Sequence, residues 1–117
     1  MAPTTHQVVL TDLAEADEIR ITDNLNREHA RVSDPEGIRL LVAWLGERED
    51  GWYVPRDGVR IVRLRLNFYG DDTTMGSVGL GRKYLVAQRR GTFAQRDAAP
   101  GDRAEALAIL GVDDPEA

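Results

Sequence analysis

The stretch "DGVRIVRLRLNFYGDD", residues 57–72, contains the clearest strand signal in the chain. Apolar residues occupy every second position from Val62 to Phe68, and polar residues, two of them arginines, stand between them. This period of two predicts a strand over residues 61–69, with one face on a core and the other toward solvent, as in antiparallel sheets. The "GDD" that follows predicts a tight turn, because Gly and Asp tolerate the dihedral angles of a reversal.

The next stretch, "MGSVGLGRKYLV" at residues 75–86, could be a phosphate-binding loop or two strands joined by a turn. Gly76 and Gly81 have the separation found in a Walker A loop. That loop then needs Lys and Ser or Thr, whereas Arg82 and Lys83 occupy these positions. The glycines also do not match G-x-G-x-x-G. We therefore predict a glycine-spaced strand that passes through a turn near Gly81 into a second strand.

The remaining elements indicate the fold class. "ADEIRITD" (residues 16–23) alternates like a strand, "NREHARVSD" (26–34) does so weakly, and residues 84–87 favour a strand by their composition. Apolar positions at helical spacing predict a helix over about 34–47, and a second helix is expected over about 101–110. We predict an α+β fold in which a mainly antiparallel sheet of about four to six strands carries both helices on one face.

The chain length of 117 residues fits a single globular domain over 1–117, with residues 1–10 as a candidate mobile N-terminal arm. No apolar run is long enough to span a bilayer, so we expect no membrane partner. The first residues lack a basic region followed by a long apolar run, which argues against a signal peptide. Without cysteine there is no disulfide or thiol chemistry, and we expect a cytoplasmic protein.

Charge is divided along the chain. Residues 1–55 carry a net charge of −6, residues 56–96 carry +6, and residues 97–117 carry −5, giving −5 in total. Fourteen of the fifteen basic residues are arginine, which makes forked contacts to carboxylate and phosphate. The simplest interpretation is internal neutralisation of the basic strands by the acidic flanks. The overall negative charge argues against strong polyanion binding.

No reaction centre stands out. His6 and His29 are the only histidines, and no spacing joins His29 to Ser33 or Ser77 as in a nucleophilic triad. The acids of the chain match no calcium loop, and none is singled out as half of a catalytic pair. We therefore expect no metal, no cofactor and no catalytic residue. An enzyme with an unassigned carboxylate site is the third hypothesis.

The candidate binding residues are cations of the basic middle region and their polar neighbours on the expected strand 61–69. They are Arg60, Arg63, Arg65, Asn67, Tyr69, Arg82 and Lys83. Such a face could hold an acidic protein, a phosphate-bearing ligand or single-stranded nucleic acid. The alternative, which we favour, is that these arginines have a structural role and pair with acids of the N-terminal strand.

From these observations we predict a small non-catalytic binding or regulatory module that acts through protein–protein contact. Its partner would be another protein with an acidic patch, or a second copy of the chain, because two-sign charge layouts guide association. The first alternative is an arginine-mediated binder of a phosphate-bearing ligand or nucleic acid that uses the polar face of strand 61–69. Arginines on that face that are exposed and unpaired would support a binding function, whereas arginines paired with acids of the same chain would support internal neutralisation.

Overall fold

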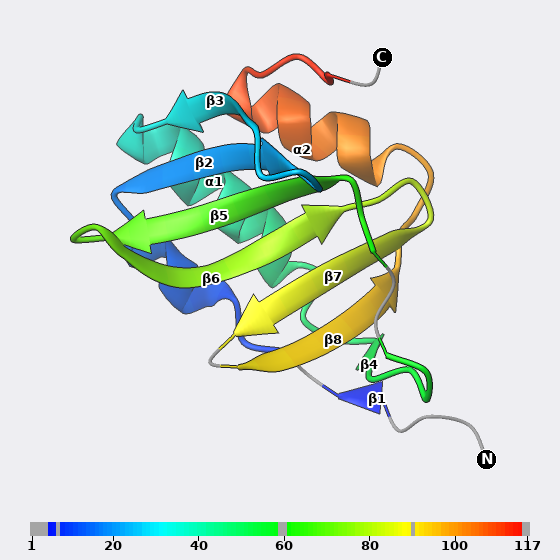
Figure 1. Cartoon of the computed structure of the whole chain (residues 1–117). Helices are drawn as coiled ribbons and strands as arrows, with labels where there is room; N and C mark the ends of the chain where they lie inside the picture. Colours follow the sequence, from blue (N-terminus) through cyan, green and yellow to red (C-terminus); the bar gives the residue numbers. More distant parts are fainter. Residues whose placement is uncertain (1–4, 7, 59–60, 90, 116–117) are drawn as a thin grey trace.

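The computed structural model describes residues 5–6, 8–58, 61–89 and 91–115. It contains one sheet of eight strands in the order β1-β4-β8-β7-β6-β5-β2-β3, and every pair of neighbours is antiparallel (Figure 1). The strands are β1 (Thr5–His6), β2 (Glu18–Asp23), β3 (Glu28–Val32), β4 (Trp52–Tyr53), β5 (Leu64–Gly70), β6 (Thr73–Leu80), β7 (Tyr84–Arg89) and β8 (Thr92–Asp97). The helices are α1 (Pro35–Gly46), α2 (Asp102–Leu110) and the short 3-10 helix η1 (Thr11–Glu15).

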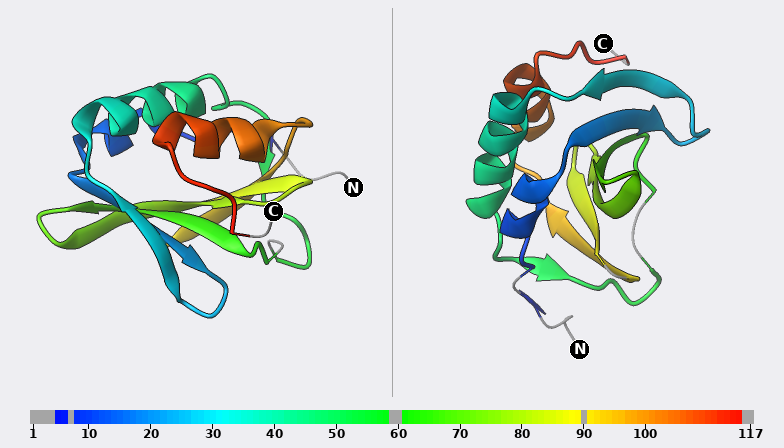
Figure 2. Two further views of the ribbon diagram at one scale, coloured as in Figure 1. Left: turned by 90° about the horizontal axis from the view of Figure 1, so that it is seen from above. Right: turned by 90° about the vertical axis from the view of Figure 1, so that its left-hand side faces the viewer.

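Both α-helices lie on the same face of the sheet, which confirms the predicted α+β class (Figure 2). The strand number exceeds the predicted four to six. Two of the additional strands, β1 and β4, have two residues each and pair with one another at one end of the sheet. A two-residue strand has no periodicity that a sequence pattern can reveal.

Strand β5 supplies the centre of the core, as its alternation predicts. Leu64, Leu66 and Phe68 are fully buried on the helix side, and the register places Phe68 opposite Ile19 and Leu66 opposite Ile21 of β2. Burial of each such side chain contributes roughly 1.5–3 kcal/mol. The strand begins at Leu64 rather than at the predicted residue 61, so residues 61–63 do not belong to β5.

The two helices begin and end close to their predicted limits. Asp34 caps α1, because its carboxylate accepts hydrogen bonds from the backbone N–H groups of Glu36 and Gly37. Helix α2 ends at Gly111, whose φ of 69° is the left-handed conformation that glycine adopts readily. Trp44 Nε1 of α1 donates to Glu105 Oε1 of α2 at 2.9 Å, which ties the helices together.

The stretch 75–86 forms the end of β6, a turn and the start of β7, so the prediction of two strands is confirmed. The turn is closed by a hydrogen bond of 2.9 Å from Gly81 N to Tyr84 O. The predicted turn before β6 is also present, with Asp71 and Asp72 at φ values of 52° and 61°.

The described end of the segment before β5, residues 61–63, lies over the face of the sheet that carries no helix (Figure 1). It lies directly on β6: a Cβ atom at Gly79 would come within 2.1 Å of Val62 Cγ2. Polar residues of this face are buried, with Ser77 6% and Gln95 2% exposed.

Near the N-terminus, Val8 N donates a hydrogen bond to Glu49 O at 2.9 Å, and Leu10 is fully buried.

Among the described residues, neither α-helix has the length and apolar character that crossing a membrane would need.

Candidate basic binding pocket

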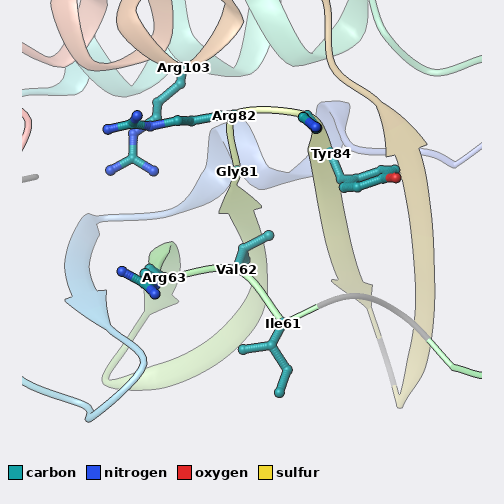
Figure 3. Close-up of a pocket in the computed structure, with 8 residues that line it drawn as sticks. Ile61, Val62, Arg63, Gly81, Arg82, Tyr84 and Arg103 are labelled. Carbon is teal, nitrogen blue, oxygen red and sulfur yellow. The ribbon is translucent and has the colours of Figure 1, made fainter.

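An open pocket of about 650 Å³ lies where the segment before β5 meets the turn between β6 and β7 (Figure 3). Among the residues that the structure describes, its lining is basic and apolar and contains no acidic side chain. The lining residues are Ile61, Val62, Arg63, Gly81, Arg82, Lys83, Tyr84 and Arg103. The positive charge and the absence of acids from the wall make this the strongest candidate site for an anionic group.

Two of the cations stand on the turn itself. Arg82 and Lys83 are exposed, and neither side chain forms a hydrogen bond or ion pair with any residue that the structure describes. The turn backbone is nevertheless held in place, because Ala98 N donates to Lys83 O at 2.9 Å. The two side chains are therefore presented to solvent from a fixed backbone.

The third cation, Arg63, is positioned by the packing of its neighbour. Val62 occupies the space above Gly79 and Gly81, where the nearest Val62 atoms would lie 2.1 and 3.0 Å from an added Cβ. Only residues without a side chain leave room for this contact. Val62 thus fixes the chain just before β5, and Arg63 lines the pocket beside it.

The fourth cation, Arg103 of α2, has a different environment. Its side chain is 8% exposed, and its Nε and Nη2 atoms donate to the two carboxylate oxygens of Asp114, each at 2.8 Å. Nη1 donates to Leu80 O of β6 at 3.0 Å. Figure 3 shows the guanidinium groups of Arg82 and Arg103 directed to the same side of the view as that of Arg63. Arg103 was not predicted as a site residue, because its helix and the pocket are brought together only by the fold.

The structure therefore brings some of the predicted site residues together in the pocket and leaves others outside it. Arg63, Arg82 and Lys83 come together in the pocket. Arg65 is half-buried on β5 next to this group, and no ion pair links it to another described residue. Arg60 lies outside the described residues.

The other two predicted residues stabilise the sheet farther along β5. Asn67 Nδ2 donates to Thr22 Oγ1 at 2.9 Å and to Arg20 O at 3.0 Å. The Tyr69 ring lies 4.1 Å from the Arg20 guanidinium carbon, a cation–π contact. These groups are already used within the fold and lie outside the pocket lining.

The expected pairing of Arg63 and Arg65 with acids of the N-terminal strand is not found among the described residues, and for Arg65 the register gives the reason. Thr22 stands opposite Arg65, whereas Glu18 stands opposite Tyr69 at the other end of the strand. Glu18 instead pairs with Arg20, its neighbour on β2. Opposite Arg65 on its other side is Gly79. The other acid of β2, Asp23, stands opposite Leu64, and its carboxylate contacts Arg27 and His29 instead.

Acids elsewhere neutralise arginines on the helix side. Arg89 of β7 donates to both carboxylate oxygens of Asp12 at 2.6 and 2.7 Å. This hydrogen-bonded pair raises the pKa of Arg89. In the turn that follows α1, Arg48 Nη2 donates to Oδ1 of the buried Asp102 at 3.1 Å. These pairs join layers of the fold.

His29 lies in the hairpin of β2 and β3 and contacts an acid of that hairpin. Its Nε2 lies 3.0 Å from Asp23 Oδ2. The Asp23 carboxylate also accepts the backbone N–H groups of Arg27 and Leu25, and the Arg27 bond is the largest cause that lowers the pKa of Asp23 to about 2. Ser77 Oγ lies 3.4 Å from Gln88 Oε1. In the described part of the chain, no group of three His, Asp or Glu residues could hold a metal ion.

Comparisons with protein-family models, with curated proteins and with solved structures found no match to this chain.

Proposed function

We propose that this protein is a small non-catalytic binding module that holds an acidic patch of a partner protein in the basic pocket. The observation that carries the proposal is the group of Arg63, Arg82 and Lys83 around one pocket, with no ion pair to any described residue. Arginine and lysine side chains without internal partners can form charge-assisted hydrogen bonds to the carboxylates of another protein. The absence of cysteine supports a cytoplasmic setting for this contact.

A protein partner is favoured over a free phosphate or a nucleic acid by the apolar residue at the pocket. Ile61 is 87% exposed, and Tyr84 lies in the same lining. An arginine group beside exposed apolar and aromatic surface is typical of the energetically important centre of protein interfaces. Nucleic-acid binding would need a longer track of cations, and the net charge of −5 weakens the attraction of a polyanion.

The proposal is tested by fluorescence anisotropy with a fluorescein-labelled poly-glutamate peptide at low ionic strength. Arg82→Ala combined with Lys83→Ala should weaken binding at least tenfold, because two contacts of roughly 1 kcal/mol each are lost. The matched control is Arg27→Ala with Arg39→Ala, which removes the same charge from two exposed side chains outside the pocket.

Three outcomes would count against the proposal. They are no peptide binding by the wild type, equal weakening by the control variant, and binding of a single-stranded oligothymidine probe in place of the peptide. Analytical ultracentrifugation of the free protein tests self-association, the remaining possibility for an acidic partner. A dimer that dissociates in the Arg82 and Lys83 variant would show that the partner is a second copy of this chain.

A further inference from the structure

One cation of the pocket lining, Arg103, is already paired with a carboxylate from outside the lining. Asp114 lies in the segment that follows α2, and its two oxygens accept both hydrogen bonds from the Nε and Nη2 edge of Arg103. This is the planar two-bond geometry in which arginine recognises a carboxylate from any source. The acid that holds Arg103 is therefore chemically equivalent to the acids that the pocket is proposed to bind.

The arrangement places Asp114 in direct competition with such an acid. Arg103 lines the pocket together with Arg63, Arg82 and Lys83, and its Nη1 is fixed on Leu80 O. The edge of the guanidinium that Asp114 uses is the edge that suits an incoming carboxylate. Because α2 and β6 hold Arg103 in place, an exchange of carboxylates requires movement of the Asp114 segment only.

The segment that carries Asp114, residues 111–115, follows α2 and contains no helix or strand. The last backbone hydrogen bond at this end of α2 is from Val112 N to Leu107 O at 3.0 Å. Beyond it, Asp113 and Pro115 are exposed, and the Asp114 side chain is 24% exposed. The Arg103 guanidinium is buried, but the Asp114 carboxylate is partly open to solvent, so a second carboxylate supported by the neighbouring cations can compete for the same edge.

We infer that Asp114 is an internal competitor that lowers the affinity of the basic pocket, and that a carboxylate of the acidic partner takes its place on Arg103. The inference rests on the proposed function, since it names a regulatory residue of the same pocket. It assigns a role to the segment after α2, which the partner would release from Arg103 on docking.

The test compares Asp114→Asn and Asp113→Asn with the wild type, using the labelled poly-glutamate peptide. Both substitutions remove one negative charge from the same segment, but only Asp114 pairs with Arg103. We expect Asp114→Asn to bind the peptide about fivefold more tightly, the equivalent of an ion pair of about 1 kcal/mol. Asp113→Asn should change the affinity less than twofold. Thermal unfolding of each variant verifies that the fold is retained.

A second readout follows the segment itself. The chain has no cysteine, so Pro115→Cys provides a single attachment point for a nitroxide spin label. Addition of the peptide should sharpen the spectrum of this label in the wild-type background. In the Asp114→Asn background the spectrum should be sharp before peptide is added.

The outcomes distinguish the two proposals. If neither the wild type nor Asp114→Asn binds the peptide, the proposed function fails and this inference with it. If the peptide binds and the Arg82 and Lys83 variant loses it, while Asp114→Asn and Asp113→Asn bind alike, the pocket stands and the role of Asp114 is refuted. An unchanged spectrum on saturation with peptide would also refute the exchange.

Discussion

Gly79→Ala tests whether the fit of Val62 on β6 builds the pocket. The added Cβ would lie 2.1 Å from Val62 Cγ2 and 3.3 Å from Val62 Cβ. Carbon atoms in contact are separated by about 3.5 Å, so the Val62 methyl group must move by about 1.4 Å. Valine has little freedom at χ1, so the backbone of segment 61–63 must shift with it.

We expect the free energy of unfolding to fall by about 2 kcal/mol, as for a core that is overpacked by one methyl group. The melting temperature should fall by about 8 °C for a domain of this size. Urea denaturation measures the first quantity and differential scanning calorimetry the second. Peptide binding should weaken as well, because the displaced segment carries Arg63 and lines the pocket.

The Val62→Ala background gives the decisive comparison. Val62→Ala removes the methyl group that lies at 2.1 Å, and the closest remaining contact of the added Cβ is then the retained Cβ of residue 62 at 3.3 Å, which a shift of a few tenths of an ångström relieves. In that background Gly79→Ala should be neutral or stabilising by up to roughly 1 kcal/mol, because alanine restricts the unfolded chain. The sign of the effect thus reverses between backgrounds. If the two substitutions are simply additive, Val62 does not depend on Gly79 and the account of the pocket is wrong.

Two further predictions concern charge. The double substitution Arg63→Ala and Arg65→Ala should change the free energy of unfolding by less than about 0.5 kcal/mol in urea denaturation. Leu64→Ala removes a fully buried side chain and should lower the same free energy by about 2–5 kcal/mol. Comparable losses in the two variants would contradict the assignment of polar and apolar faces to β5. The pKa of Asp23 is lowered from 3.8 to about 2, first of all by the backbone N–H of Arg27, so its carboxylate stabilises the fold above pH 4 and this contribution is lost as the pH falls from about 4 to 2. The stability difference between the wild type and Asp23→Asn should therefore narrow over that range when unfolding is followed by circular dichroism, and a constant difference would exclude the carboxylate as its source.

The parts of the fold that the sequence predicts are those with a local period. Strand β5 shows strict alternation, and α1 combines an apolar stripe with a capping residue, so neither needs information from the rest of the chain. In strand β8 a large apolar side chain is exposed and a polar side chain is buried, the opposite of what side-chain polarity predicts. Phe93 is 45% exposed, whereas Gln95 is 2% exposed and donates to Tyr53 OH at 3.0 Å. Its burial depends on the partner in β4, which no reading of residues 92–97 alone could supply.

The candidate site was predicted in part for a similar reason. Composition identifies the basic middle of the chain, and Arg63, Arg82 and Lys83 belong to it. Whether these cations meet acids depends on register, and the neutralisation that composition favoured does not occur for them. Arg103 and Asp114 lie eleven residues apart and meet at the pocket because α2 turns its buried side toward β6. Only the packed structure contains that information.

The glycines of residues 76–81 connect the sheet to the pocket. A phosphate loop would use such residues to bring backbone N–H groups to a ligand. Here the N–H of Gly81 is already bonded to Tyr84 O, and the space at Gly79 is filled by Val62. The glycines therefore act on the chain itself: they admit segment 61–63 to the sheet and so bring Arg63 to the basic turn. Anion binding at this site then depends on side-chain cations, which is why the substitutions that test it are Arg82→Ala and Lys83→Ala.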